Sequence, residues 1–557
     1  MSSSSLRTSV SSKACDSCRK RKVKCDSQEQ CANCRISNID CLYTRIAKKR
    51  GPRASRPVRV DTSSLRNNSL APATSLLQGN IDQSTTVPVA NTPQPTAPWE
   101  TPSPAAWSAA PTGTDSLREA QAILDTLVNS LAILLPAMRA IDMASDCIDL
   151  YMQYTFPTAP FVHELRLRND ARYFFATAHA PTLFEGANDD EILFLMRGFT
   201  LLVSLCASMS AVMPDSLLAY GKMVDRLFLK AARAMLKIYE DFDIDFPDSS
   251  SLAIRSLQSS ALQHITGRKG AAFHIFGQST LLAQSMRLYD ENAIARDDPV
   301  ESKLLRLNFW TAYSSDKGGQ VLGTRPTVLH ELLLPAEITT SPYGETFVPL
   351  LDMNNPRYGE QFEVNLLIGF HLMPRLWSST ARLLVSLKAR EPIARVTDWY
   401  FKFVGIIDGL PSWLQVSSLL PSAGDTDADT FRKTCFWVQR CTLMMSFHCL
   451  RLVILQGCIE HNACHIMGLT DQPLAGTMKK MEIIQEFLQT ADDIPFIYHQ
   501  IKGEPSVERI RHVGTTLLEM MQNVDNEVIR ARANMFFTRL LDLLAKLDSK
   551  ASAELSR

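Results

Sequence analysis

A cysteine spacing that occurs twice in the first 41 residues constrains the fold of this chain more than any other feature. Two and then six residues separate the cysteines of each half, and five residues separate the halves. The six positions are Cys15, Cys18, Cys25, Cys31, Cys34 and Cys41. Cysteine thiolates favour tetrahedral zinc, and a Cys-x-x-Cys pair closes a tight chelate on one metal ion. The spacing therefore predicts a zinc-binding cluster.

The number of cysteines decides how many zinc ions this cluster can hold. Two independent four-sulfur sites would need two more cysteines than the six present. Two sulfurs must then be shared, and the repeat favours Cys15 and Cys31, the first cysteine of each half, as bridges. The remaining pairs, Cys18 with Cys25 and Cys34 with Cys41, complete one site each. We expect two zinc ions per chain.

Two other uses of the cysteines compete with this one. Disulfides require an oxidising compartment, and the first ten residues, "MSSSSLRTSV", contain no apolar stretch of the kind found in a secretory signal. A single four-cysteine zinc site with two unused thiols remains a possible alternative, although it would not use the symmetry of the repeat.

Charge is unevenly distributed along the chain. Residues 1–60 hold 15 Lys and Arg residues against four Asp and Glu residues, a net charge of +11, so the remainder carries −11 because the whole sums to zero. Such asymmetry indicates a nucleic-acid-binding head on a solvated body. The densest cationic run lies between Cys18 and Cys25, where Val23 alone interrupts it, and it consists of Arg19, Lys20, Arg21, Lys22 and Lys24. Flanking zinc ligands would hold a short helix here in one orientation, with its cations toward DNA.

Several stretches of the head resemble a known family. "ACDSCRKRKVKCD", "CANC", "NIDCLY" and "KKRGPR" resemble the fungal binuclear zinc cluster of transcription regulators, in particular activators of maltose and sucrose use. The resemblance implies that Lys22 reads a CGG-type triplet of double-stranded DNA and that Arg19, Arg21 and Lys24 follow the DNA backbone. One departure is the loop "DSQEQ", which lacks the proline usual in this family.

The chain is expected to divide into four segments. Residues 1–12 form a disordered tail, and residues 13–45 form the zinc cluster with two short helices. Residues 46–115 form a basic arm followed by a disordered linker rich in Ser, Thr and Pro. Lys48, Lys49 and Arg50 in the arm would contact phosphates, serve nuclear import, or both. Residues 116–557 form a large all-helical domain.

The helical domain should begin with an amphipathic helix that Asp115 or Ser116 caps and that Pro136 ends. Its leucines include three at a strict seven-residue spacing, at positions 117, 124 and 131. This is less than a coiled coil requires, so an ordinary helix of the domain is favoured and a homodimer stays open. Apolar residues 198–213 carry no charge but are too few to span a bilayer, which predicts a buried core helix and no membrane segment.

The stretch "LRLNFWTAYSSDKGGQVLGTRPTVL", residues 305–329, resembles the middle regulatory domain that accompanies these clusters. The resemblance implies a helix ending in a turn, with Phe309 and Trp310 in the core and with a regulatory role. Asp316, Gly323, Arg325 and Pro326 would shape the turn.

Two weaker patterns have competing interpretations. Cys458, His461, Cys464 and His465 have ligand chemistry at helical spacing, but buried structural thiols are the favoured interpretation. "YEDFDIDFPD", residues 239–248, alternates acidic and apolar residues as activation segments do, but an acidic loop between helices is favoured.

Together these features predict a nuclear, sequence-specific regulator of RNA polymerase II genes, more specifically an activator that contacts the transcription machinery. It would control either carbon-source use or a secondary-metabolite gene cluster. The chain contains none of the common catalytic signatures Gly-x-Ser-x-Gly, His-Glu-x-x-His or the phosphate-binding glycine loops, so no enzyme is predicted. The alternative is a zinc-dependent protein-interaction module or co-regulator without its own DNA specificity.

Overall fold

The computed structural model describes residues 15–21, 25–26, 28, 30–36, 39–42, 113–176, 183–184, 188–330, 347–470 and 472–547. The chain separates into two compact units, Met1–Ala97 and Pro98–Arg557. Within the described residues every regular element is a helix, and no strand occurs among them. Residues 1–14 and 43–112, which include the predicted tail, basic arm and most of the linker, lie outside the described residues.

The first unit contains the two expected short helices, α1 (Asp16–Lys20) and α2 (Ala32–Ile36). The second unit begins with α3 (Thr114–Leu134), α4 (Ala140–Leu150), the π-helix η2 (Tyr151–Thr155), α5 (Glu164–Ala176), α6 (Asp189–Val212), α7 (Gly221–Asp245), α8 (Ser249–Thr266), α9 (Lys269–Ser285), α10 (Glu291–Ile294) and α11 (Pro299–Val321). It continues with α12 (Glu360–Lys388), α13 (Ile393–Asp408), η4 (Ser412–Leu414), α14 (Val416–Leu419), α15 (Asp427–Glu460), η5 (Cys464–Met467), α16 (Pro473–Asp493), α17 (Ile497–Gln500), α18 (Glu504–Asn523) and α19 (Glu527–Lys546).

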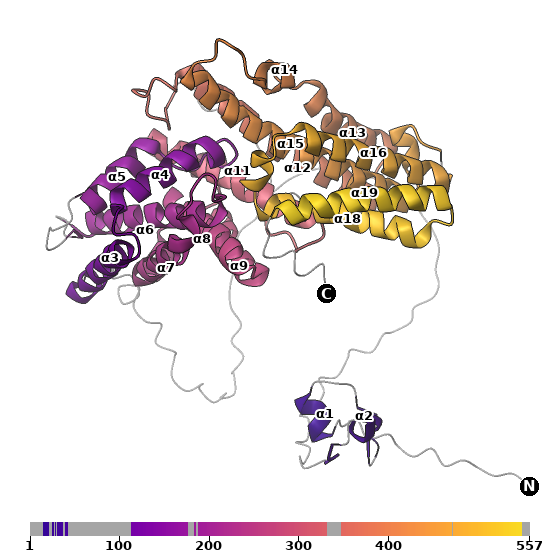
Figure 1. The fold of residues 1–557 in the computed structure, drawn as a ribbon, viewed down its shortest axis with the longest axis horizontal. Helices are drawn as coiled ribbons and strands as arrows, with labels where there is room; N and C mark the ends of the chain where they lie inside the picture. Colours follow the sequence, from indigo (N-terminus) through magenta and orange to yellow (C-terminus); the bar gives the residue numbers. More distant parts are fainter. Residues whose placement is uncertain are drawn as a thin grey trace, which may run out of the picture. The chain divides into compact units, whose positions relative to one another are not determined.

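The helices of the second unit form two groups (Figure 1). The first group, α3 to α9, lies on one side, and the second group, α12 to α19, lies on the other. Helix α11 packs against α8 and α9 of the first group and against α12 of the second, while α15 packs against η2, α12, α16 and α18. These contacts make α11 and α15 two of the elements that join the two groups.

Two helices, α6 and α15, are long and apolar enough to cross a membrane by length and composition alone, and most of each is buried within the unit. Asn188 caps α6 by accepting a hydrogen bond from the amide of Glu191, and three acidic residues occupy the first turn, where the helix dipole favours negative charge. The uncharged stretch of α6 packs against α7 and α8. The prediction of a buried core helix at residues 198–213 is therefore confirmed.

Helix α3 begins two to three residues earlier than the sequence predicted. Its N-cap is Gly113, with no side-chain hydrogen bond, so the assignment of the cap to Asp115 or Ser116 was wrong. Gly113 has the extended backbone conformation of an N-cap residue, although it has no side chain that could accept a hydrogen bond. Leu124, Leu127 and Leu131 are buried and α3 packs against α7, which confirms an ordinary amphipathic helix of this domain.

The predicted acidic loop at residues 239–248 is mostly helical, because α7 continues to Asp245. The cause is Asp243, whose carboxylate is fully buried and pairs with Arg197 at 2.8 Å and with Arg255 at 2.5 Å. Ser251 also donates a hydrogen bond to it. Asp248 caps α8 in a capping box with Ser251. The acidic residues of this segment thus include the buried Asp243 on α7, which forms ion pairs with Arg197 on α6 and Arg255 on α8.

The turn expected at the end of the helix in residues 305–329 is present, and it follows Val321, where α11 ends. Phe309 and Trp310 are buried in α11, and Gly323 has a φ of +68°, a left-handed conformation that favours glycine. The carboxylate of Asp316 accepts hydrogen bonds from the amides of Val328 and Leu329. The expected core and turn roles in this stretch are confirmed for these residues.

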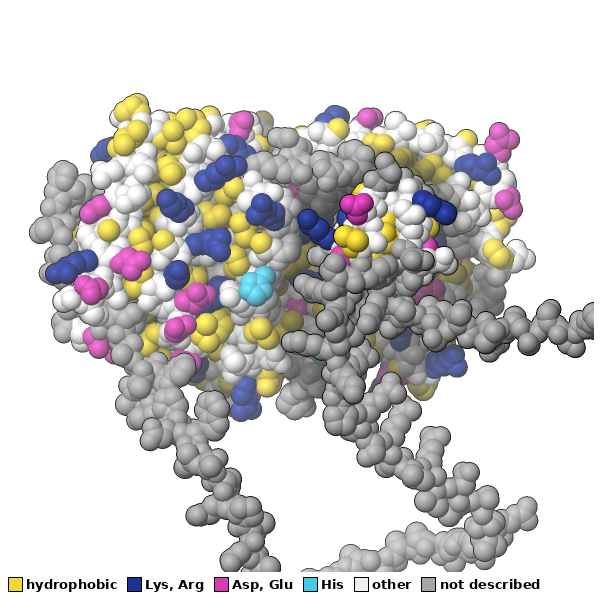
Figure 2. Space-filling model, turned by 90° about the horizontal axis from the view of Figure 1, so that it is seen from below, with side chains coloured by type: hydrophobic (Ala, Val, Ile, Leu, Met, Phe, Trp, Pro, Cys, Tyr) yellow, Lys and Arg dark blue, Asp and Glu magenta, His cyan; other side chains and the backbone are white. Residues whose placement is uncertain are grey.

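Lys and Arg side chains are interspersed with apolar side chains on the face of the second unit at the left of Figure 2. A shallow hollow of about 970 Å³ lies between α7, α8 and α9. Its exposed cations are Arg226, Lys230, Arg233 and Lys237 of α7, together with Arg268. These side chains are surface charges, in contrast to the buried cations described below.

Candidate zinc centre and DNA-binding face

The sequence repeat of the head is also a repeat of local structure. Helix α1 starts directly after Cys15 and α2 starts directly after Cys31, so one helical turn brings each Cys-x-x-Cys pair together. The amide of Cys18 donates to the Sγ of Cys15 at 3.4 Å, and the amide of Cys34 donates to the Sγ of Cys31 at the same distance. The two halves therefore form the same turn.

The third cysteine of each half returns to the first. The amide of Cys15 donates to the Sγ of Cys25 at 3.4 Å, and the amide of Cys31 donates to the Sγ of Cys41 at 3.3 Å. Each half thus folds its own third sulfur against the start of its helix. Together with the paired turns, these contacts bring all six sulfurs to one place.

Hydrogen bonds of the backbone and of two side chains connect the two halves. The amide of Asp16 donates to the carbonyl of Leu42 at 2.8 Å, and the hydroxyl of Ser17 donates to the carbonyl of Asp40 at 2.7 Å. At the start of α2, the amide of Ala32 donates to Oδ2 of Asp26 at 3.0 Å. Asp26, the first residue of the stretch that lacks the usual proline, is thus bonded to the start of α2.

The sulfurs form two groups of four that share two members. One group contains Cys15, Cys18, Cys25 and Cys31, and the other contains Cys15, Cys31, Cys34 and Cys41. Within each group the ligand atoms lie within 4.8 Å of one another. Zinc–sulfur bonds of about 2.3 Å in a tetrahedron give sulfur separations of roughly 3.8 Å, so the donor set fits two zinc ions. The structure brings together the sulfurs that the sequence assigned to each ion.

The protein favours ionisation at the two shared sulfurs. The hydrogen bond from the Cys18 amide lowers the pKa of Cys15 to about 6, against the opposing effect of burial. Burial also opposes ionisation of Cys31, but the Cys34 amide and neighbouring thiols outweigh it and lower its pKa. Burial raises the pKa of Cys34 to about 12 and raises that of Cys18 as well. Bound zinc would supply the positive charge that the remaining thiolates need.

The predicted DNA-contacting residues are only partly placed. Arg19 and Lys20 end α1 and Arg21 follows it, with the side chains of Lys20 and Arg21 exposed. The other predicted contacts, and the side chain of Arg19, fall outside the described residues, namely Lys22, Lys24, Lys48, Lys49 and Arg50. Arg35 occupies in α2 the position that Arg19 has in α1, and its side chain is exposed. The 16-residue repeat could have identified Arg35 as a further cation of this surface.

The second cysteine and histidine pattern makes no metal-ligand group in the described part of the chain. Helix α15 ends at Glu460, and His461 directs its Nδ1 to the carbonyl of Gly457. Cys458 and Cys464 are buried, and burial raises the pKa of Cys458 to about 12. These thiols pack in the core, as the favoured interpretation predicted.

Comparison with known proteins gives matches to the head. Residues 13–50 match the family described as the fungal Zn(2)-Cys(6) binuclear cluster domain. A maltose fermentation regulatory protein of Saccharomyces cerevisiae is 46% identical over 43 residues, 8% of this chain and 9% of that protein. The xylanolytic transcriptional activator of Aspergillus oryzae is 38% identical over 61 residues, 11% of this chain and 6% of that protein.

A third relative, the ABC-transporter-regulating transcription factor of Aspergillus fumigatus, is 46% identical over 41 residues, 7% of this chain and 5% of that protein. The matched segments thus span less than a tenth of the length of each of these three relatives. No solved structure matches the chain. The cysteine geometry and the match agree on the same residues: residues 13–50 form a fungal Zn(2)-Cys(6) binuclear cluster domain, which binds two zinc ions.

Proposed function

We propose that this protein is a sequence-specific DNA-binding transcription regulator that acts in the nucleus. The observation that carries the proposal is the pair of four-sulfur groups that share Cys15 and Cys31 and that hold the exposed cations Lys20 and Arg21 beside them. A cationic helix end fixed by a rigid cluster loses little conformational entropy when it meets DNA.

The six head cysteines are the proposed zinc ligands. Cys15 and Cys31 bridge the two ions, while Cys18 with Cys25 and Cys34 with Cys41 complete the two sites. The zinc ions are structural, because four protein sulfurs leave no open position for a substrate. Metal binding would then supply most of the folding free energy of a head this small.

We propose two kinds of DNA contact, one to base edges and one to phosphates. Lys22 reads the guanines of a CGG-type triplet in the major groove, where N7 and O6 accept hydrogen bonds. Phosphate contacts come from Arg19, Lys20, Arg21 and Lys24 near the cluster and from Lys48, Lys49 and Arg50 in the arm. Phosphate contacts give affinity and salt dependence, whereas base contacts give specificity. A homodimer would read two such triplets at a fixed spacing.

The regulatory role rests on the relatives and on the second unit. The names of the three relatives place them in maltose fermentation, xylan breakdown and transporter regulation. We propose that this chain activates genes of one metabolic pathway, for carbon-source use or for a secondary metabolite. The all-helical region from residue 116 onward would regulate that activity and contact the transcription machinery.

The proposal is tested by the fluorescence anisotropy of labelled duplexes with the full-length zinc-loaded protein. The wild type should prefer a CGG-containing duplex over a scrambled one, and affinity should fall steeply with salt. Lys22→Ala should remove about 1–3 kcal/mol of discrimination between the two duplexes and leave zinc content unchanged. Lys230→Ala, which removes an exposed cation from α7, is the matched control and should change neither. Equal binding of both duplexes by the wild type would refute sequence-specific recognition.

A further inference from the structure

A cavity of about 340 Å³ lies inside the second unit, where the two groups of helices meet. Its walls come from η2 and the loop that follows it, from α6, α8, α9, α11 and the turn after it, α12 and α15, and from α18 with the segment that joins it to α17. A cavity of this size is within the range of sites that enclose small organic molecules. Its place between the two groups means that elements from both contribute to one surface.

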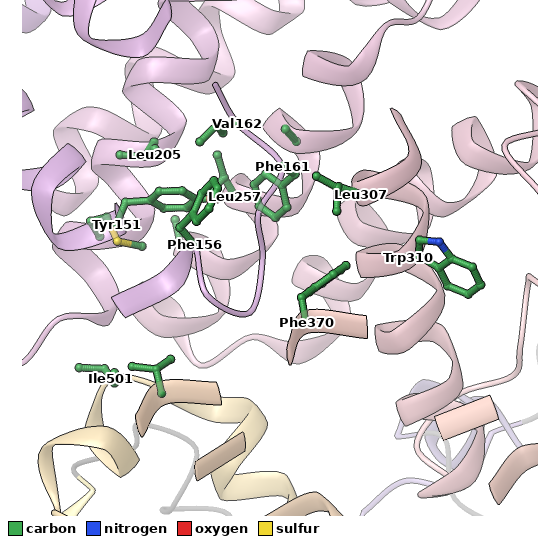
Figure 3. Packing of buried hydrophobic residues seen from close by; sticks show 14 of the residues in the cluster. Tyr151, Phe156, Phe161, Val162, Leu205, Leu257, Leu307, Trp310, Phe370 and Ile501 are labelled. Carbon is green, nitrogen blue, oxygen red and sulfur yellow. The ribbon is translucent and has the colours of Figure 1, made fainter. Parts of the chain in front are cut away.

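Much of the wall is apolar and aromatic. Figure 3 shows four of the lining side chains, Phe161, Leu257, Phe370 and Ile501, which come from separate elements. On α9, Phe273 and Phe276 also line the cavity. The guanidinium of Arg325 lies over both of these rings, at 4.9 and 5.0 Å from their centroids. An occupant with an apolar or aromatic body would match these walls.

Two cations of the same cavity, Lys502 and Arg509, form no ion pair with a carboxylate in the part of the chain that the structure describes. The Nζ of Lys502 donates to the hydroxyl of Thr158 at 2.6 Å, and the Nη1 of Arg509 donates to the carbonyl of Pro505 at 3.1 Å. Arg509 is 9% exposed, and neither cation forms an ion pair within the described residues. Glu508 is the one carboxylate among the described lining residues. Arg509 is buried and Lys502 is half-buried. Cations removed from water without a counter-ion cost free energy, so such groups are often found at functional sites.

Two further observations point to a missing polar partner. Burial lowers the pKa of Lys502 to about 7, and the positive charge of Arg509 lowers it further. On the α11 wall, the Oγ of Ser314 is buried and has no hydrogen-bond partner in the structure. An anionic group is the kind of occupant that these donors favour, because it accepts hydrogen bonds and balances the positive charge.

We propose that this cavity binds a small organic carboxylate whose apolar body packs among the aromatic side chains and whose carboxylate is held by Lys502 and Arg509. A carboxylate fits better than a neutral molecule, because the described lining contains more basic than acidic side chains. The basic residues are Arg325, Lys502 and Arg509, and the acidic residue is Glu508. This binding site does not depend on DNA recognition by the head, so its test can fail while the proposed function stands.

Isothermal titration calorimetry of the full-length protein, without DNA, tests the proposal with three carboxylates and their primary amides. The carboxylates are benzoate, 3-phenylpropanoate and octanoate. At least one should bind saturably and at least tenfold more tightly than its amide. Lys502→Met and Arg509→Met should each weaken that carboxylate at least tenfold, while Lys230→Met on the outer face should leave it unchanged. Equal binding of acid and amide, or no binding of any of the three acids, overturns the proposal.

A second measurement uses the wild-type protein, so it does not depend on whether the variants fold. A benzoate that carries a trifluoromethyl diazirine is photolysed with the full chain, and the labelled peptides are mapped by mass spectrometry. Labels should fall on peptides that contain Phe370 or Ile501, and the best-binding acid should compete them away. Labels confined to other peptides, or labels that the acid does not displace, would place the carboxylate elsewhere and refute the assignment.

Discussion

The Sγ atoms of Cys15 and Cys31 lie 3.7 Å apart, and each belongs to both four-sulfur groups of the head. These two cysteines are the equivalent first members of a 16-residue repeat, and each directly precedes a short helix. A shared sulfur couples the two metal sites, because its loss removes a ligand from both. A terminal sulfur belongs to one site alone.

This difference predicts unequal effects of two cysteine substitutions. Cys31→Ala should lose both zinc ions and unfold the head, since neither site keeps four sulfurs. Cys41→Ala should keep one zinc ion in the intact site. Cys464→Ala, in the helical unit, removes a thiol that is not in either group and should keep both ions. Zinc per chain is measured by inductively coupled plasma mass spectrometry, and two ions retained in Cys31→Ala would exclude the bridging assignment.

Arg21 is exposed directly after α1 and should contact a phosphate rather than a base. Arg21→Ala is expected to weaken binding to CGG-containing and scrambled duplexes by the same factor and to reduce the salt slope of the affinity by about one. Anisotropy titrations at several salt concentrations measure both quantities. A selective loss on the CGG duplex would instead assign Arg21 to base recognition.

The buried carboxylate of Asp243 should matter far more than an exposed one. Asp243→Ala leaves Arg255 buried without its partner and is expected to cost about 3–5 kcal/mol in the free energy of unfolding. The control is Asp115→Ala, because the Asp115–Arg118 pair is 96% and 81% exposed and should contribute under about 1 kcal/mol. Urea denaturation followed by circular dichroism gives both values. Similar losses in the two variants would show that the Asp243 pair adds little.

Replacement by alanine should change the stability of the helical unit in opposite directions at Gly323 and at Gly405. Gly323 has a φ of +68° and open space around the position of a Cβ, so Gly323→Ala should destabilise the turn by roughly 1 kcal/mol through backbone strain alone. Gly405 lies inside α13, also with open space, and Gly405→Ala should stabilise the unit by roughly 1 kcal/mol. Thermal denaturation of both variants measures the two shifts. A shift of the same sign in both would show that the backbone conformation of Gly323 does not set the difference.

The lowered pKa of Lys502 makes its contribution to stability depend on pH. Its pKa is about 7 in the folded protein and near 10.4 when unfolded, so the unfolded state binds more protons between these values. The penalty for burying Lys502 is therefore full below pH 7 and shrinks as the pH rises toward 10. Lys502→Met should be more stable than the wild type at pH 7, and this difference should decrease by pH 9. A difference that stays constant in urea titrations at the two pH values would contradict the lowered pKa.

The zinc centre could be predicted from the sequence because its information is local. Six sulfurs within 27 positions, with short intervals, leave few ways to satisfy tetrahedral zinc. The same holds for the turn after α11, where Gly323 and Asp316 lie within a few residues of the backbone that they shape.

The parts that sequence reasoning missed depend on contacts between distant positions. Asp243 looked like one member of an acidic loop, because its partner Arg197 lies 46 positions earlier in α6. At the cavity, Lys502 contacts Thr158, which lies 344 positions earlier in the chain. No spacing pattern in the sequence predicts that contact. Burial in a helical domain is decided by packing of whole helices, which a single sequence does not specify.

Native mass spectrometry combined with alkylation shows most directly whether two metal ions share the six sulfurs of the head. The zinc-loaded full-length protein is weighed under native conditions, then treated with iodoacetamide and mapped by peptide. We expect a mass increase of two zinc ions and protection of all six head cysteines. One zinc ion, with two of the six cysteines alkylated, would contradict the shared cluster and establish a single four-cysteine site.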